Sequence, residues 1–556
     1  MVNDGWNIAD VWESHASVVG DAPALFFGDL ERSWSEFEDR AARLASTFVS
    51  AGLEPGAKVA LYLYNGAAYL EATFAAFKQR LVPVNVNYRY TDAELVYLLD
   101  NSDAEVVVVD TTFVGNVARI AEQLPKVRLI IEVDEIGEGP NPAGATIDGL
   151  VRFEDEIAAN DPAPHIERSL DDLWFLYTGG TTGMPKGVMW PHRSLIGSGG
   201  PTYKPYGFAV PRSIEEFASL ALAVHDGVHA PVRLLPAAPL MHGTSAIASW
   251  GVLNAAGSVV LLTSRSFDAA ELLSTVQRRS VTNLTIVGDA FAKPMIAELE
   301  AAEERGEPYD LSSLRLVVSS GVMWSQQTKD ALLARADVAC ADLLGSSEGV
   351  GFANSVAKRN RPAPTARFRL GPDAQVFNDA GERVVPGSGE RGVLAVGGPI
   401  PIGYYKDTSK SAETFRTFEG RVWSVPGDFA TVEADDTITL LGRGSVCINT
   451  AGEKVFAEEV EETLKRHADV RDANVVGVPD DRWGNAVVAV VGLEPGVRPT
   501  EGTEAELRDH CRTTLAGYKV PKRIVFVDSV LRGPTGKADY RWAASIAAAP
   551  VAEDGR

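Results

Sequence analysis

Strands that alternate with helices dominate the first part of this 556-residue chain. Apolar runs typical of strands lie at Val59–Tyr64, Val82–Val86 and Glu105–Asp110, with helical stretches between them at Gly66–Arg80 and Asp92–Asp100. Such an order predicts parallel βαβ units, because a chain usually crosses over through a helix before it adds a parallel strand. We therefore expect an α/β fold, in a chain long enough for more than one domain.

Charge and cysteine content exclude several function classes. The formal net charge of −23 disfavours the phosphate backbone of nucleic acid as a partner. Cys340, Cys447 and Cys511 form no CxxC pair, which argues against structural zinc and for a reducing compartment. Met1–Gly20 lacks the pattern of a signal peptide, and the most apolar stretch, Val252–Thr263, is too short to span a bilayer. We expect a cytoplasmic protein without a transmembrane segment.

A stretch rich in glycine and threonine, Tyr177–Val188 (Y-T-G-G-T-T-G-M-P-K-G-V), follows an apolar run that predicts a strand. In such a loop, backbone N–H groups and hydroxyls can converge on a phosphate while Lys186 supplies positive charge. The stretch is not a Walker A loop, because Pro185 precedes the lysine and Gly187 follows it. Taken alone, it also fits a flexible surface loop.

The stretch resembles the phosphate-binding signature of the acyl-adenylate-forming (AMP-binding) superfamily, which includes acyl-CoA synthetases, 4-coumarate-CoA ligases, luciferases and peptide-synthetase adenylation domains. Gly179 stands where the family usually has serine. The resemblance implies contacts to ATP from Thr178, Gly179, Gly180, Thr181, Thr182, Gly183 and Lys186.

A second motif, Leu344–Gly349 (L-G-S-S-E-G), resembles the family's aromatic-Gly-x-Thr-Glu turn. The resemblance implies that Glu348 holds the Mg²⁺ that bridges the ATP phosphates, a role that suits a carboxylate. Leu344 replaces the aromatic residue that stacks on adenine, and Ser347 replaces threonine. The further nucleotide contacts implied by this turn and by a preceding small-residue loop are Ser320, Gly321, Leu344, Gly345, Ser346 and Ser347.

The turn Pro239–Thr244 (P-L-M-H-G-T) resembles the family's Pro-Leu-x-His turn, whose histidine lines the acyl pocket. A predicted helix at Ala246–Ala256 follows, and its small residues beside Trp250 leave room for a bulky apolar acid, although ordinary helix packing explains them equally well. A general base is identified first by its distance from the proton that it takes, which a sequence does not show. We therefore expect His242 to line the pocket and do not assign it as a base. The acyl-pocket residues implied by the resemblance are His242, Gly243, Trp250, Gly288, Gly321 and Gly349.

Motifs of the last third resemble the nucleotide and hinge motifs of the family. Asp428 ends a turn that resembles x-Thr-Gly-Asp and would bind the ribose hydroxyls, with Pro426 in place of the usual threonine. Arg443 would reach the nucleotide, and Gly444 and Ser445 would form the hinge. The resemblance thus implies a large N-terminal domain (residues 1–442), with βαβ sheets and a small barrel-like part, hinged to a small α+β C-terminal domain (residues 443–556).

The predicted C-terminal domain carries two more resemblances. Ile448–Glu462 matches the loop and helix that close over the pantetheine tunnel in the family, which implies CoA contacts from Gly452 and Lys454. The segment Arg532–Lys537 (R-G-P-T-G-K) places Lys537 where the family keeps its adenylation lysine.

The reaction implied by these motifs is ATP-dependent acid–CoA ligation through an acyl-AMP intermediate, with Mg²⁺ as cofactor. Lys186, Glu348 and Lys537 would surround the phosphates as charge shifts. We hypothesise that Lys537 serves only the first half-reaction, because rotation at Gly444 and Ser445 would exchange it for the loop at Gly452.

The acid is less defined than the reaction. The sequence as a whole resembles bacterial fatty-acyl and steroid side-chain CoA ligases, which favours a lipophilic acid, and an aryl acid is the alternative. Adenylation for a carrier protein, a luciferase-like oxygenase and a non-catalytic nucleotide-binding relic are rival interpretations. A homodimer is compatible with the sequence.

Overall fold

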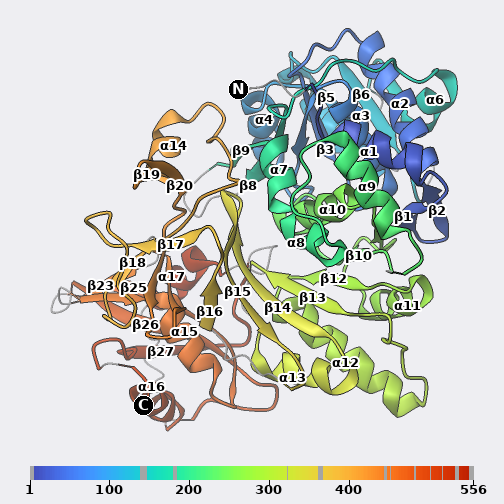
Figure 1. The fold of residues 1–556 in the computed structure, drawn as a ribbon. Helices are drawn as coiled ribbons and strands as arrows, with labels where there is room; N and C mark the ends of the chain where they lie inside the picture. Colours follow the sequence, from blue (N-terminus) through green and yellow to red (C-terminus); the bar gives the residue numbers. More distant parts are fainter. Residues whose placement is uncertain are drawn as a thin grey trace. The chain divides into compact units, whose positions relative to one another are not determined.

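The computed structural model describes residues 5–137, 147–178, 184–228, 230–321, 324–360, 367–443, 447–450, 453–480, 484–500, 502–515, 517–532 and 538–549. The chain, drawn as a ribbon in Figure 1, divides into two compact units. The first unit comprises Met1–Thr365, Gly371–Ala374 and Val396–Ser424, and the second comprises Ala366–Leu370, Gln375–Ala395 and Val425–Arg556.

A seven-stranded sheet of the first unit has the order β7-β6-β5-β3-β4-β8-β9. All its neighbouring strands are parallel except the β8–β9 hairpin. The helices α3 (Ala67–Lys78) and α4 (Asp92–Asn101) provide crossovers, so the predicted βαβ units are confirmed. The strands are β3 (Lys58–Tyr62), β4 (Val82–Asn85), β5 (Ala104–Asp110), β6 (Leu129–Val133), β7 (Leu150–Arg152), β8 (Leu173–Thr178) and β9 (Lys186–Pro191).

The other sheet region of the first unit runs β2-β1-β11-β10-β12-β13-β14-β15. Its central strands are parallel, and antiparallel pairs (β1–β2 and β14–β15) close the two ends. The strands are β1 (Pro23–Phe27), β2 (Leu30–Ser33), β10 (Arg233–Pro236), β11 (Ser258–Leu261), β12 (Asn283–Ile286), β13 (Leu316–Ser320), β14 (Ala339–Ser346) and β15 (Gly349–Ala357). A further hairpin pairs β19 (Phe415–Phe418) with β20 (Arg421–Ser424).

Helices of the first unit bury apolar stripes against these sheets. In α2 (Trp34–Ser50), Phe37, Leu44 and Phe48 are fully buried, as their helical spacing predicts. A capping box at Ser33 begins this helix. The other described α-helices of this unit are α1 (Ile8–Val18), α5 (Val114–Ile120), α6 (Phe153–Ala159), α7 (His192–Ser198), α8 (Gly200–Tyr203), α9 (Ile214–Val224), α10 (Gly243–Asn254), α11 (Ala269–Arg279), α12 (Asp289–Arg305), α13 (Gln326–Arg335) and α14 (Thr408–Thr414).

The second unit contains two β regions. One comprises β16 (Arg367–Leu370), β17 (Ala374–Phe377), β18 (Arg391–Val396), β21 (Asp428–Val432) and β22 (Thr437–Arg443). The other is the sheet of β25 (Val470–Asp480), β26 (Gly484–Leu493) and β27 (Arg523–Val527), with the hairpin of β23 (Cys447–Thr450) and β24 (Glu453–Phe456) and the helices α15 (Ala457–Lys465), α16 (Thr503–Arg512) and α17 (Tyr540–Ala548). The predicted α+β character of the C-terminal part is thereby confirmed.

The predicted boundary between the two domains and the predicted hinge lie close together in the sequence. The predicted domain boundary falls at Arg443, the last residue of β22, while the second compact unit already includes residues from Val425 onward. Gly444 and Ser445 lie outside the described residues, so the hinge stays a prediction.

Among the described helices, none combines the length and apolar character needed to cross a membrane.

Candidate functional site

The β8–β9 hairpin brackets the predicted phosphate loop. Thr178 and Lys186 are register partners at its loop end, and residues 179–183 lie outside the described part. Gly187 follows the lysine, and a Cβ at this position would lie 2.5 Å from the Tyr177 ring. A glycine at this position therefore lets the Tyr177 ring lie against the backbone of β9, directly after Lys186.

Asn85, at the end of β4, ties the start of this loop to the turn before His242. Its Oδ1 accepts a hydrogen bond from the Tyr177 N–H at 2.6 Å, and its Nδ2 donates to the Tyr177 carbonyl at 2.8 Å and to the Met241 carbonyl at 2.7 Å. The side chain is buried. We did not predict this residue, and a polar amide ending a buried apolar strand was the only signal for it.

Lys186 forms an ion pair with Asp407, with 2.5 Å between Nζ and Oδ2. The side chains are 41% and 29% exposed, so solvent reaches the pair. The hydrogen bond from Lys186 lowers the pKa of the Asp407 carboxyl below its ordinary value. Asp407 also caps α14, because its Oδ1 accepts a hydrogen bond from the Lys410 N–H at 2.9 Å. The carboxylate is thus held from two sides.

Glu348 lies in the turn between β14 and β15. The Tyr404 hydroxyl donates a hydrogen bond to its Oε1 at 2.7 Å, and the Glu348 N–H donates to Ser346 Oγ at 3.2 Å. Trp190 of β9 donates from Nε1 to the Ser347 carbonyl at 3.0 Å, which ties the turn to the strand that begins with Lys186. The second carboxylate oxygen of Glu348 offers the hard oxygen ligand that Mg²⁺ prefers.

The structure therefore brings two predicted residues to one neighbourhood, since Lys186 and Glu348 both contact the segment from Tyr404 to Asp407. An ammonium group and a carboxylate placed beside a glycine-rich loop can neutralise a polyphosphate and hold its divalent cation. Tyr404 and Asp407 were not predicted as site residues.

Residues predicted to contact the nucleotide base lie at the carboxyl ends of the parallel strands β13 and β14, or directly after them. Ser320 of β13 is the register partner of Leu343 in β14, directly before Leu344. A Cβ at Gly345 would lie 3.8 Å from Ser320 Oγ. Gly321 adopts a φ of +93°, a conformation that few other residues reach. Because ligands in open α/β sheets bind at the carboxyl ends of strands, this placement supports the predicted role.

Predicted acyl-pocket residues occupy several environments. His242 directly precedes α10, and a Cβ at Gly243 would lie 2.8 Å from Leu176 of β8. Trp250 is buried and packs edge-to-face on Trp174, with 4.1 Å between ring centroids.

Three further predicted pocket residues are glycines, of which Gly321 is the residue with the φ of +93°. Gly288 follows β12, where its N–H donates to Ser319 Oγ at 2.9 Å. A Cβ at Gly349 would meet Val396 at 2.8 Å. None of these contacts requires an acyl ligand, so the acyl pocket stays a prediction.

In the second unit, Asp428 and Arg443 are register partners on β21 and β22. Lys454 of β24 is the register partner of Asn449 of β23, and Gly452 lies outside the described residues. Lys537 also lies outside them, but Ala538 directly after it forms a β-bridge with Arg532.

Arg532 anchors that bridge. Its guanidinium binds Asp472 through two hydrogen bonds, of 2.6 and 2.5 Å. In the sequence, the predicted catalytic Lys537 thus directly precedes Ala538, which is held by its β-bridge to Arg532.

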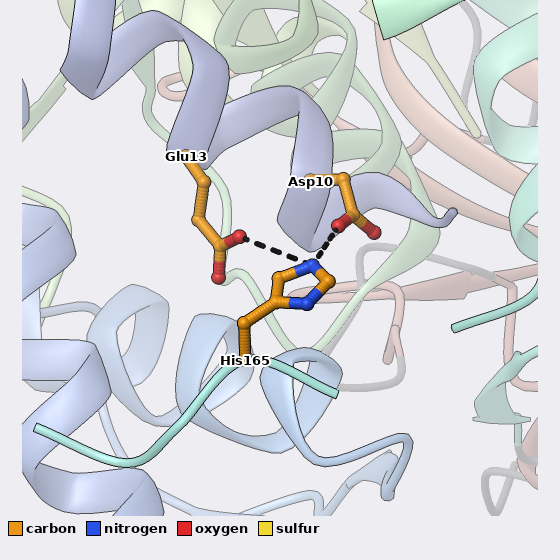
Figure 2. Close-up of side chains that lie close together, drawn as sticks. All are labelled: Asp10, Glu13 and His165. Carbon is orange, nitrogen blue, oxygen red and sulfur yellow. Dashed lines mark hydrogen bonds and ion pairs between the residues drawn. The ribbon is translucent and has the colours of Figure 1, made fainter. Parts of the chain in front are cut away.

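One cluster of potential metal ligands lies elsewhere in the described part, formed by Asp10, Glu13 and His165. His165 Nε2 lies 2.8 Å from Asp10 Oδ1 and 4.0 Å from Glu13 Oε2 (Figure 2). Arg168 pairs with both carboxylates at 2.8 Å, and Lys78 pairs with Glu13 at 2.7 Å. Because these cations already balance the carboxylates, the cluster is an ion-pair network that joins α1 to the chain before β8.

Comparison with protein families gives two matches. Residues 12–405 match the model of the AMP-binding enzyme family, and residues 459–537 match the AMP-binding enzyme C-terminal domain. A protein of Mycobacterium tuberculosis (strain ATCC 25618 / H37Rv), named medium/long-chain-fatty-acid–CoA/3-oxocholest-4-en-26-oate–CoA ligase, is 41% identical over 99% of this chain and 97% of its own length.

More distant relatives agree with these matches. The 3-oxocholest-4-en-26-oate–CoA ligase of Rhodococcus rhodochrous is 39% identical over 97% of this chain and 95% of its own. The feruloyl-CoA synthase of an Amycolatopsis species is 31% identical over 93% and 94%.

Solved structures match the fold. The anthranilate CoA ligase AuaEII, in complex with anthranoyl-AMP, aligns with a TM-score of 0.79 at 23% identity, over 98% of both chains. The predicted two-domain fold and the predicted enzyme class, an AMP-forming acyl-CoA synthetase, are confirmed by the comparisons. Through the match over residues 12–405 and these full-length relatives, the chain belongs to the AMP-binding enzyme family.

Proposed function

We propose that this enzyme joins a lipophilic carboxylic acid, a fatty acid or a steroid side-chain carboxylate, to the thiol of CoA at the expense of ATP. The observation that carries the site assignment is the convergence of Lys186 and Glu348 on one segment beside the β8–β9 hairpin. The substrate class rests on relatives at 39–41% identity, whose names specify fatty acids and a steroid carboxylate.

The reaction has two balanced steps. A carboxylate oxygen attacks the α-phosphorus of ATP, and the bond to pyrophosphate breaks. The CoA thiolate then attacks the acyl carbon, and the bond to the AMP oxygen breaks. No covalent bond to the enzyme is needed, so the protein contributes positioning and charge stabilisation.

Lys186 would contact the phosphates that leave in the first step, and Glu348 would hold Mg²⁺, which neutralises phosphate charge when bound. Asp428 and Arg443 would bind the nucleotide, and Lys537 would serve adenylation. We place the division between the catalytic domains at residues 442 and 443, with Gly444 and Ser445 as the hinge and Gly452 and Lys454 on the CoA side. We also place the enzyme in the cytoplasm, a reducing compartment that suits the free thiols of Cys340 and Cys511.

An aryl acid is the second candidate substrate, because a relative at 31% identity is named feruloyl-CoA synthase. The two candidates differ in the space that they need along α10. A rigid aryl acid fills a short pocket, whereas a long acyl chain or a sterol ring system needs an extended apolar channel.

Pyrophosphate release with MgATP should be measured across octanoate, palmitate, a steroid side-chain carboxylate, benzoate and ferulate, with and without CoA. We expect release with the fatty or steroid acids, and acyl-CoA only when CoA is present. Release with aryl acids alone would overturn the substrate class. A folded enzyme that binds MgATP but releases no pyrophosphate with any acid would overturn the ligase proposal.

A further inference from the structure

The segment from Ile402 to Asp407 adds to the free edge of β9 like an extra strand. The Ile402 N–H donates to the Met189 carbonyl at 3.0 Å, the Met189 N–H donates to the Gly403 carbonyl at 2.9 Å, and the Tyr405 N–H donates to the Gly187 carbonyl at 2.8 Å. Since β9 begins with Lys186, the backbone of this segment is fixed relative to the predicted phosphate site.

Side chains in the middle of this segment anchor it to Asp103, directly before β5. The Tyr405 hydroxyl donates to Asp103 Oδ2 at 2.7 Å, and Lys406 Nζ lies 2.7 Å from the same oxygen. Lys126 binds the other oxygen at 2.8 Å. Against the opposing effect of burial, these hydrogen bonds hold the pKa of Asp103 below its ordinary value, so the carboxylate stays charged. Tyr405 also packs on Phe175 of β8.

The residues at the two ends of the anchored stretch reach the two charged groups. Tyr404 contacts Glu348 at 2.7 Å, and Asp407 contacts Lys186 at 2.5 Å. Lys406, the anchoring residue directly before Asp407, adopts a φ of +57°, which turns the chain there. Asp407 is then fixed by its capping bond to α14. Of these four consecutive residues, the inner two bind the scaffold at Asp103 and the outer two contact Glu348 and Lys186.

We propose that Tyr404 and Asp407 are positioning residues, which hold Glu348 and Lys186 in the arrangement that MgATP requires. The inference rests on the proposed roles of Glu348 and Lys186 in ATP binding. A lysine ammonium has three donors, so Lys186 can keep Asp407 and still bind phosphate. Likewise, the Tyr404 hydroxyl donates to Oε1 of Glu348, and Oε2 would be the oxygen that holds the cation.

Two conservative variants test the proposal. Asp407→Asn removes the charge but keeps a side chain that caps α14, and Tyr404→Phe removes only the hydroxyl. Matched controls are Asp92→Asn, which breaks an exposed pair with Arg119, and Tyr309→Phe, which loses a hydrogen bond to Glu298. Melting temperatures of all four variants establish that the fold is kept.

The readouts are the Kd for MgATP by calorimetry, pyrophosphate release, and thioester formation from premade acyl-AMP. Loss of an orienting partner behind a metal ligand typically costs about 10–100-fold. We expect weaker MgATP binding and slower pyrophosphate release, by about 5–50-fold, in both variants. Tyr404→Phe should also need more Mg²⁺ for half-maximal activity. Conversion of premade acyl-AMP should stay at the wild-type rate, because pyrophosphate has already left.

Several results would overturn the proposal. One is unchanged MgATP binding in both variants. Another is an equal loss in both half-reactions, which would indicate a merely structural role. Tighter MgATP binding by Asp407→Asn would show that Asp407 competes with phosphate and does not position the lysine. Failure of the proposed function would look different, because the wild type itself would then release no pyrophosphate.

Discussion

The side-chain amide of Asn85 is paired with both backbone groups of Tyr177, since its Oδ1 accepts from the Tyr177 N–H at 2.6 Å and its Nδ2 donates to the Tyr177 carbonyl at 2.8 Å. The same Nδ2 donates to the Met241 carbonyl. One buried residue therefore fixes both the strand that enters the predicted phosphate loop and the turn that carries His242.

Replacing this amide should destabilise the first unit. Asn85→Leu would leave three buried backbone groups without partners, each of which costs about 1–3 kcal/mol. We expect a loss of at least about 3 kcal/mol in the free energy of unfolding, measured by urea denaturation, together with weaker MgATP binding. Asn116→Leu, which loses a hydrogen bond to the Tyr62 hydroxyl, is the control. Equal stability of the two variants would contradict the role of Asn85.

Lys186 should be essential for pyrophosphate release. Removing one preorganised charge from a transition state typically costs about 10²–10³ in rate. We expect Lys186→Ala to lose that factor in kcat/KM for ATP, measured by pyrophosphate release. Lys410→Ala, which breaks an exposed pair with Glu413, should stay within about twofold of wild type. Similar rates for both variants would remove Lys186 from the site.

Lys537, outside the described residues, should serve only the first half-reaction. We expect Lys537→Ala to lose pyrophosphate release while it still converts premade acyl-AMP and CoA to the thioester. Rapid quench with both substrates separates the two steps. Loss of both steps in a folded variant would refute the exchange of Lys537 for the CoA loop by rotation at Gly444 and Ser445.

Glu461 should make the stability of the second unit depend on pH. Burial raises its pKa to about 7, and its Oε1 accepts a hydrogen bond from the Val475 N–H at 2.8 Å. A raised carboxyl pKa means that the folded state binds more protons than the unfolded state between the two pKa values. Stability from this group is therefore present below the unfolded pKa and is lost as pH rises toward 7.

Glu461→Gln keeps the acceptor and removes the titration. One pKa unit corresponds to about 1.4 kcal/mol. The free energy of unfolding of the variant minus that of the wild type should therefore be larger at pH 8 than at pH 5, by on the order of 2 kcal/mol. Thermal unfolding across this range measures the gain, with the exposed Glu506→Gln as control. A stability difference between variant and wild type that does not change with pH would contradict the raised pKa of the buried Glu461 carboxyl.

Periodicity predicted most elements because burial imposes it directly. The run Val106–Val109 is fully buried in β5, and the helical stripe of α2 packs into the core. Element ends were less accurate. We expected a helix at Ala246–Ala256, whereas α10 begins at Gly243, since the extended backbone of His242 lets the helix begin there. The small residues Gly243, Thr244 and Ser245 at the beginning of α10 show no apolar periodicity that would predict this helix start.

Charged residues of the site were predictable only where a local motif carried them. Lys186 and Glu348 lie in short motifs, and both roles followed from the resemblance. Their partners did not, because the pair between Lys186 and Asp407 spans 221 residues. Asn85 and Tyr177 are likewise 92 residues apart. Only the strand order of the sheet brings such residues together, and no local pattern encodes it.

The most direct test of the acyl-adenylate mechanism follows an oxygen label from the acid to AMP. The wild-type enzyme should be incubated with ATP, CoA and a fatty acid that carries ¹⁸O in both carboxylate oxygens, and the products analysed by mass spectrometry. Attack of the carboxylate on the α-phosphorus, followed by thiol attack on the acyl carbon, places one labelled oxygen in AMP and leaves the other in the thioester. We predict that result. Unlabelled AMP, or label in the released phosphates, would contradict an acyl-adenylate mechanism.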